Sequence, residues 1–367
     1  MANFYKRLDN AKDVVSTRTL LHEAIPLTGT IVSGTYDDAN IKDYSHGMFQ
    51  SVYDYPYLSS SANHVFDITV GVSAKSGIYA TSNTQASKKK NIYNQMAQVL
   101  MGYDHTGSVQ QFDEDGNIAG GGNKLNDVFF LNFSRLLVKD EIKKGSFELE
   151  LTVDGAFEQS RTALFNSENR IKISDQSGSA GYLVNSPAGE YGVLYATASN
   201  TTSQILKANS NFPVGLVYYQ AGVAVLSASI FNDAALGGIL NNSNDFTPMT
   251  RNQETIRQIM TGSEISSIAN AFRTRLYNVQ FNNTIELNST VYFCRMNHNE
   301  FNYSTNPTYL SGSKIRVKEK TTDVPIAYVT SIGLYNQNNE LMGVAKLSEP
   351  LRKDPSQEYT IRCRLDF

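Results

Sequence analysis

The C-terminal segment of the chain shows the most regular alternation of apolar and polar residues. Tyr359–Phe367 places an apolar side chain at every second position, and threonine, arginine and aspartate occupy the positions between. Successive side chains of a β-strand point to opposite faces, so the pattern predicts a strand with one buried and one charged face. Such a strand needs a sheet to join, and we expect that sheet to be a scaffold for contacts with other chains.

A hairpin is predicted just before this strand. Ala327–Tyr335 and Leu341–Leu347 are two apolar-rich runs joined by the Asn-rich turn Gln337–Asn339, a pattern typical of paired antiparallel strands. The polar and aromatic segment Phe301–Pro307 fits no regular element, so we expect a loop there. Pro350 follows the second run and is expected to end it.

The middle third of the chain is a succession of strand-like runs separated by clusters of glycine, asparagine and serine. The predicted strands are 128–133, 147–154, 191–196, 214–219 and 223–230. Strands with such punctuation are typical of a sandwich or barrel. Val214–Phe231 is the most apolar window, but Tyr218–Gly222 interrupts it. A membrane span needs about 20 unbroken apolar residues, so two buried strands joined by a tight turn are the better interpretation.

Two segments have the period of an amphipathic helix. In 87–101 the apolar residues Ile92, Met96 and Leu100 recur every fourth residue, and a glycine follows. The second helix is predicted within 250–278, where Ile265, Ile268, Phe272 and Leu276 share one face, Thr261 and Glu264 form a capping box, and Arg273 and Arg275 occupy the last turn. This helix is expected to cover one side of the sheet.

Two shorter segments also bear on the predicted helices. Lys88–Lys90 place three cations at a helix N-terminus, where the helix dipole disfavours them. Either this helix end is solvated, or it faces an acidic patch of a neighbouring subunit. Val14–Ile25 is predicted to be a short helix that ends before Pro26.

The N-terminal quarter of the chain has little periodicity. Tyr53-Asp54-Tyr55-Pro56-Tyr57 is an aromatic cluster stiffened by proline, so the segment has too many aromatic residues to be simply disordered. We expect an arm that orders against a partner or against the rest of the chain. The predicted organisation is an extended arm over 1–85, a central and mostly β domain over 86–300, and a C-terminal β module over 301–367.

The predicted fold is mainly β. It has an antiparallel β-sandwich or barrel-like core, two short amphipathic helices and the extended N-terminal arm. The chain has 21 tyrosines and 18 phenylalanines and no tryptophan. The abundance of tyrosine and phenylalanine supports the predicted β fold, because half-buried strand positions favour these rings.

Net charge and cysteine content narrow the function classes. The 367-residue chain carries a net charge of -3, which argues against a nucleic-acid binder that depends on phosphate contacts. The N-terminal residues lack the apolar segment of a secretory signal. Cys294 and Cys363 are therefore expected to be buried free thiols of a protein made in reducing cytosol.

The chain offers no constellation of residues typical of catalysis or metal binding. Its five histidines have no partner at helical spacing. Asp115-Gly116 looks like part of a calcium loop but lacks the later acidic ligand, so a plain turn is expected. The acidic pair Glu148 and Glu150 could serve a glycosidase, although charge on an edge strand is far commoner. We therefore predict no catalytic residue, no cofactor, no metal and no enzymatic activity.

Several phrases of the sequence resemble virion structural proteins of contractile-tailed bacteriophages, above all the T4-like phages of marine cyanobacteria. They are Ser45–Gln50, Tyr53–Tyr57 and Tyr218–Leu226. Phe301–Pro307 is similar to a phrase repeated in phage particle proteins. The hairpin that begins at Ile332-Gly333-Leu334-Tyr335-Asn336 resembles that of tail-fibre attachment and baseplate modules.

The resemblance implies a non-enzymatic component of the virion that is assembled in the host cytoplasm. The first expectation is a tail or baseplate subunit that contacts other virion proteins and further copies of itself in a ring, with no nucleic acid and no membrane as partner. The alternatives are a neck or head–tail connector protein, and a receptor- or carbohydrate-binding module. The expected contact residues are Tyr53, Tyr55, Tyr57, Phe301, Tyr303, Pro307, Leu334, Tyr335 and Leu347.

Overall fold

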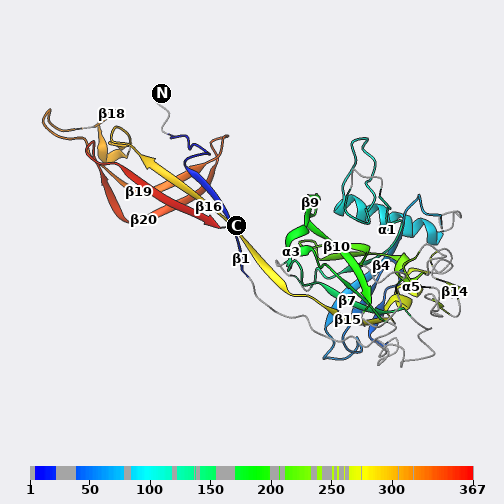
Figure 1. Cartoon of the computed structure of the whole chain (residues 1–367). Helices are drawn as coiled ribbons and strands as arrows, with labels where there is room; N and C mark the ends of the chain where they lie inside the picture. Colours follow the sequence, from blue (N-terminus) through cyan, green and yellow to red (C-terminus); the bar gives the residue numbers. More distant parts are fainter. Residues whose placement is uncertain are drawn as a thin grey trace. The chain divides into compact units, whose positions relative to one another are not determined.

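The chain is mainly β, as the sequence predicts, and each strand pair whose register the structure describes is antiparallel (Figure 1). It divides into two compact units: unit 1 is Met1–Leu20 with Glu286–Phe367, and unit 2 is Leu21–Ile285. The computed structural model describes residues 5–21, 39–77, 84–117, 122–135, 137, 141–153, 170–198, 206, 211–232, 238–241, 250–251, 254–255, 260, 264–273, 275–304, 306–316 and 318–366.

Unit 2 is organised around one antiparallel sheet of eleven strands. In hydrogen-bonding order the strands are β15 (Leu276–Gln280), β7 (Glu148–Thr152), β8 (Arg170–Ser174), β10 (Gly189–Ala198), β11 (Phe212–Tyr218), β12 (Val223–Ser227), β5 (Asp127–Asn132), β4 (His64–Val72), β3 (Gln50–Tyr53) and β2 (Ile41–Asp43), and β9 (Leu183–Ser186) also pairs with β10. The predicted pair of buried strands at 214–230 is confirmed, since Tyr218 of β11 pairs with Val223 of β12. The last residues of that run, Ala228–Phe231, form the 3-10 helix η3 instead.

Both faces of this sheet are buried, which gives unit 2 a sandwich-like interior. On one face of strand β5, Phe129 and Leu131 belong to a cluster of 38 buried apolar residues. On the other face, Val128 and Phe130 belong to a second cluster of 16. A strand covered on both faces needs apolar residues at successive positions, which explains why this run does not alternate.

The two predicted amphipathic helices are confirmed. Helix α1 (Thr84–Leu100) packs against β4 and contributes Ile92 and Leu100 to the smaller cluster. Helix α5 (Ile265–Arg273) packs against β3 and β4. Leu276 lies in β15 rather than on the helix, and Thr261 of the expected capping box lies outside the described residues. A short extra helix, α3, spans Gly178–Gly181.

The structure corrects the expected N-terminal helix. Residues Val14–Leu21 form strand β1 of unit 1, which lies beside β16 (Asn283–Met296). The backbone N–H of Phe293 donates to the carbonyl of Asp13 at 2.8 Å. Valine and threonine recur in this segment and favour the extended backbone, so strand pairing prevails over the helical period.

The structure also divides the chain differently from the three predicted parts. Residues 39–77 are not an arm, because β2, β3 and β4 belong to the large sheet. Ile41, Val52 and Phe66 are buried in the larger cluster of unit 2. Residues 22–38 of the expected arm lie outside the described residues.

Unit 1 contains short antiparallel sheets. β16 pairs with β21 (Tyr359–Asp366) from Ser289 opposite Asp366 to Met296 opposite Tyr359. β19 (Ala327–Tyr335) and β20 (Leu341–Lys353) form the predicted hairpin. Short strands β17 (Leu310–Ser311) and β18 (Lys314–Ile315) pair with each other. The same β16 begins in unit 2, where Asn283 and Thr284 pair with β6 (Glu141–Ile142).

The last strand follows its predicted alternation over its first five residues. Tyr359, Ile361 and Cys363 are half-buried or buried, whereas Thr360 and Arg362 are exposed. Both cysteines are free thiols, as expected, but only Cys363 is buried, and Cys294 is half-buried. Burial raises the pKa of Cys294 to about 11, which keeps this thiol protonated at neutral pH.

Gly71 provides a test of how α1 sits on the sheet. A Cβ atom at this position would lie 2.6 Å from Cε2 of Phe130 and 3.1 Å from the Cα of Tyr93 in the helix. We expect Gly71→Ala to lower the free energy of unfolding by about 1–3 kcal/mol because the helix must move away. Urea unfolding measures this change. Val99→Ala, at an exposed site of α1, is the control, and equal stability of both variants would contradict this packing.

Candidate functional site

The nine predicted contact residues fall in two places. Tyr53, Tyr55 and Tyr57 belong to unit 2. The remaining six belong to unit 1, in the β19–β20 hairpin and the loop that precedes it. Each place is therefore a separate candidate surface.

The β19–β20 hairpin presents one apolar face to solvent. Opposed residues of an antiparallel pair share a face, and Gly333 opposes Val344 while Tyr335 opposes Leu341. Tyr335 is 45% exposed, Leu341 53% and Val344 57%. The ring of Tyr5 lies 4.8 Å from that of Tyr335 and is 54% exposed. We call these residues, with Met342 in the adjoining bulge, the outer face of the hairpin.

The opposite face of the hairpin turns toward its own unit but is only half-buried. Ile332, Leu334, Ala345 and Leu347 all have intermediate exposure. A Cβ on Gly343 would meet the side chain of Leu365 in β21 at 3.7 Å. Of the predicted contact residues, Tyr335 thus lies on the outer face, whereas Leu334 and Leu347 lie on the inner one.

The interior of unit 1 is small for its length. Among the residues that the structure describes, its buried hydrophobic side chains are Val291, Met296, Ala327 and Cys363. The two large clusters of buried apolar residues lie entirely within unit 2. Unit 1 therefore leaves most of its apolar side chains partly or fully in contact with water.

Pro350 does not end the second strand of the hairpin, contrary to the expectation. The register shifts between Val329, which pairs with Leu351, and Ser331, which pairs with Lys346. The residues between 346 and 351 form a bulge, and Pro350 lies in it. A proline cannot donate to the sheet but is tolerated in a bulge, so the strand continues to Lys353.

The loop before the hairpin is held by a buried lysine. Lys353 is fully buried, and its Nζ donates to the carbonyl of His298 at 3.3 Å, to Oδ1 of Asn302 at 2.8 Å and to the carbonyl of Asp354 at 2.9 Å. Phe301 lies between two of these contacts and has a φ of 56°, a conformation that a phenylalanine rarely adopts. The loop is therefore held in a fixed and strained conformation.

This anchoring exposes the aromatic residues of the loop. Phe301 and Tyr303 are each 40% exposed. Pro307 is exposed and begins the 3-10 helix η6 (Pro307–Tyr309), which the side chain of Asn306 caps by accepting from the N–H of Thr308 at 3.1 Å. The structure thus brings the predicted loop residues to the surface of unit 1. No pattern in the sequence indicates the role of Lys353.

In the tyrosine cluster of unit 2, Tyr53 packs against a hydrogen-bonded histidine. The ring of Tyr53 lies edge-on to His64 at 5.6 Å and tilted to Tyr57 at 6.3 Å. Nε2 of His64 lies 2.8 Å from Oδ1 of Asp67. Burial works against the charge of Asp67, but hydrogen bonds from His64 and Ser51 hold the pKa of its carboxyl below its ordinary value.

The neighbouring tyrosines are more accessible than Tyr53. Tyr55 is 47% exposed and Tyr57 38%. The structure therefore brings the three predicted tyrosines into one surface region, with Tyr53 as its half-buried base.

The position of Lys89 fits neither interpretation of Lys88–Lys90, which were a solvated helix end and a contact with an acidic patch of a neighbouring subunit. It is fully buried, and its Nζ donates to the carbonyl of Met260 at 2.6 Å. Burial lowers its pKa to about 8. The middle lysine of Lys88–Lys90 thus joins α1 to the segment before α5 rather than facing solvent or a neighbouring subunit.

A buried aspartate, Asp175, directly follows strand β8 of the large sheet. Asp175 is 1% exposed and accepts hydrogen bonds from the N–H of Gly145 at 2.7 Å, the N–H of Phe147 at 3.0 Å and the hydroxyl of Tyr219 at 3.1 Å. Burial raises its pKa to about 6, although these donors favour the charged form. No spacing in the sequence distinguishes this aspartate from the exposed ones.

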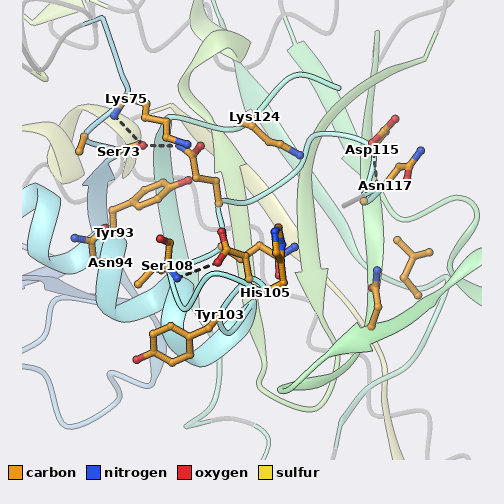
Figure 2. Close-up of a pocket in the computed structure, with 18 residues that line it drawn as sticks. Ser73, Lys75, Tyr93, Asn94, Tyr103, His105, Ser108, Asp115, Asn117 and Lys124 are labelled. Atoms are coloured by element: carbon orange, nitrogen blue, oxygen red, sulfur yellow. Dashed lines mark hydrogen bonds between the residues drawn. The ribbon is translucent and has the colours of Figure 1, made fainter. Parts of the chain in front are cut away.

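A cleft of about 1170 Å³ opens on unit 2 beside the C-terminal half of α1 (Figure 2). Sequence reasoning did not identify it, because its walls come from segments far apart in the chain. The lining residues are Ser73, Ala74, Lys75, Tyr93, Asn94, Tyr103, Asp104, His105, Ser108–Gln111, Asp115–Asn117, Lys124, Leu183 and Asn185.

The predicted turn at Asp115-Gly116 lies at the edge of this cleft. Gly116 has a φ of 75°, and the chain reverses so that Asp113 pairs with Lys124. The carboxylate of Asp113 is ion-paired with the Lys124 ammonium group. Across the described parts of the chain, His, Cys, Asp and Glu side chains nowhere gather in threes closely enough to hold a metal ion.

None of the helices that the structure describes combines the length and the apolar character needed to cross a membrane. In comparisons with known proteins, no family model, no curated protein and no solved structure matches the chain.

The pKa of Asp175 predicts a pH-dependent stability. Between an unfolded pKa near 3.8 and a folded pKa of about 6, the folded state binds the proton more tightly. Protonated Asp175 therefore adds up to about 3 kcal/mol to the free energy of unfolding below pH 4. This stabilisation is lost as pH rises to 6. Urea unfolding of the wild type and Asp175→Asn across this range measures it. Parallel pH profiles for the two proteins would contradict the assignment.

Replacing Lys353 tests the anchoring of the loop. Lys353→Met leaves the oxygens of His298, Asn302 and Asp354 without their shared donor, so we expect unit 1 to lose about 1–3 kcal/mol of stability. Hydrogen exchange over residues 298–303 should accelerate. Lys346→Met, on the exposed side of the same strand, is the matched control. An unchanged exchange rate in Lys353→Met would contradict the role of this lysine.

Proposed function

We propose that this chain is a non-enzymatic structural subunit of the virion of a contractile-tailed, T4-like bacteriophage, located in the tail or baseplate. The resemblance of the segments at 45–50, 53–57, 218–226 and 301–307 to phage particle proteins supports the assignment. The structural observation that carries it is the outer face of the hairpin on a unit with few buried apolar side chains.

The outer face has the composition of an interface centre. From Ala327 to Ala345 the only charged residue is Glu340, and interface centres are depleted of charge and rich in tyrosine and methionine. Tyr5, Tyr335, Leu341, Met342 and Val344, each about half exposed, offer on the order of 600 Å², against roughly 800 Å² per partner in a standard interface. An apolar patch of this extent is at the upper end of the largest patches found on monomeric proteins, which are often functional surfaces.

The strand edges of the hairpin provide a second means of contact. Within the described residues, β19 and β20 pair only with each other, so each strand leaves one row of backbone groups open. A strand of another chain can add to such an edge through main-chain hydrogen bonds. Particle proteins that lock together during assembly make use of this geometry.

The proposed partners are other virion proteins and further copies of this chain in a ring. The residues of the outer face carry no charge, and the exposed Lys346, opposite Ser331, borders them. A patch with so little charge can face its own copy with little like-charge repulsion. The exposed residues of Lys314–Lys320, by contrast, are mostly basic and would repel a second copy. Symmetry repeats each contact around a ring, so modest contacts accumulate. The fixed loop with Phe301 and Tyr303 and the tyrosine cluster of unit 2 are proposed as additional contact sites.

Charge placed on the outer face tests the proposal. We expect Tyr335→Glu with Val344→Glu to abolish oligomer formation by the purified protein and its incorporation into particles, because two carboxylates must then be desolvated. Thermal unfolding of unit 2 should stay the same. Sedimentation velocity and particle composition are the measurements.

Val99→Glu is the matched control, since it adds a carboxylate at an exposed apolar position of α1 in unit 2. Assembly of the double variant at the wild-type level would contradict the proposal. Electron cryomicroscopy of the intact particle then separates a tail or baseplate location from the neck.

A further inference from the structure

We infer that the cleft of unit 2 binds an uncharged oligosaccharide. This inference goes beyond the assembly role and does not depend on it, because the cleft lies in unit 2 and the hairpin in unit 1. It rests on the size, rigidity and charge balance of the cleft and on the groups that line it.

The cleft is large enough for an extended ligand. Its volume of about 1170 Å³ exceeds the roughly 300–1,000 Å³ of sites that enclose drug-sized molecules. The walls come from α1, the loop 103–111, the turn at 115–117 and strand β9. Figure 2 shows Tyr103 at one margin and Asn117 at the other.

The base of the cleft is held by internal hydrogen bonds. The hydroxyl of Tyr93 donates to the carbonyl of Leu125 at 2.7 Å. The amide nitrogen of Gln111 donates to Oγ of Ser73 at 2.7 Å and to Oδ1 of Asn126 at 2.9 Å. A site that is already ordered loses less entropy when it binds a ligand.

The loop that carries Tyr103 is ordered by Asp104. Oδ1 of Asp104 accepts from the N–H of Thr106 at 2.8 Å and from the N–H of Ser108 at 2.9 Å, and Tyr103 pairs with Val109 across the turn. Tyr103 is nevertheless 60% exposed. An aromatic ring that is carried by an ordered loop and is open to solvent offers an apolar platform for the C–H face of a sugar.

The charged groups along the cleft leave no positive excess, and this selects against anionic ligands. Lys75 and Lys124 are opposed by Asp104 and Asp115, and the buried Asp113, which pairs with Lys124, adds a third carboxylate. A phosphate or a sulfated chain would find no net positive field. When it enters the cleft, an uncharged ligand loses less hydration energy than a charged one.

The neutral polar groups match the chemistry of sugar hydroxyls. Asn94, Gln110, Asn117 and Asn185 line the cleft, and each amide both donates and accepts hydrogen bonds, as a hydroxyl does. Oδ1 of Asn185 holds the hydroxyl of Tyr191 at 2.6 Å, which fixes the orientation of this amide. Apolar contact from Val109 and Leu183 completes a surface that suits a molecule with alternating hydroxyls and C–H groups.

Binding of defined oligosaccharides to the full chain tests the inference. The probes are neutral gluco-, galacto- and manno-oligosaccharides of four to six units, with sialylated oligosaccharides and inorganic phosphate as charged comparisons. We expect at least one neutral series to saturate below about 10 mM, a weak but specific affinity. Saturation-transfer NMR and isothermal titration calorimetry are the measurements.

Variants locate the binding. Tyr103→Ala should weaken the affinity at least about tenfold, and Tyr103→Phe should keep it within about threefold because the ring stays. Asn117→Ala should also weaken the affinity for the oligosaccharide, because it removes an amide at the opposite margin of the cleft. Val99→Ala, at an exposed position of α1 outside the lining of the cleft, should bind as the wild type does.

Three results would overturn the inference. They are the absence of saturation with every neutral series, tighter binding of the charged probes, and wild-type affinity in both Tyr103→Ala and Asn117→Ala. Thermal unfolding of each variant confirms that unit 2 is folded.

Discussion

The shortage of buried apolar surface in unit 1 is the constraint on which the account depends. Among the described residues, unit 2 holds clusters of 38 and 16 buried apolar side chains, whereas unit 1 buries four hydrophobic residues. Burial of apolar surface is the main force that offsets the entropy lost on folding. Unit 1 therefore leaves apolar side chains exposed that its own residues do not cover, and this supports the proposal that association with another chain covers them.

The details of unit 1 are consistent with that condition. Lys353 fixes the loop before the hairpin through three oxygen acceptors, so the exposed aromatic residues there are ordered before any partner arrives. The bulge at Pro350 lets β20 continue past a proline. Preorganised apolar groups lose less entropy on association than mobile ones. The residues that line the cleft all belong to unit 2, so the proposed assembly role and the inferred oligosaccharide binding use different residues of the chain.

Local patterns were sufficient to predict β5, β7, β10–β12, the β19–β20 hairpin, β21, both amphipathic helices and the mainly β fold, because period and turn chemistry are properties of neighbouring residues. They misassigned Val14–Leu21, where pairing with β16 prevails over a weak helical period, and the arm, because the partners of β2–β4 lie outside the segment. Buried charges such as Lys89 and Asp175 could not be predicted, since their acceptors and donors are distant in sequence. The cleft was missed for the same reason. Exposure of the loop aromatics and Tyr335 was predictable from the polar residues around them.

The most direct test is hydrogen exchange of the β19 and β20 amides in the isolated monomer and in the assembled state. The account predicts that these amides exchange much faster than those of β5 and β12 in the monomer, and become strongly protected on assembly. Protection in the monomer equal to that of the large sheet, with no change on assembly, would contradict it.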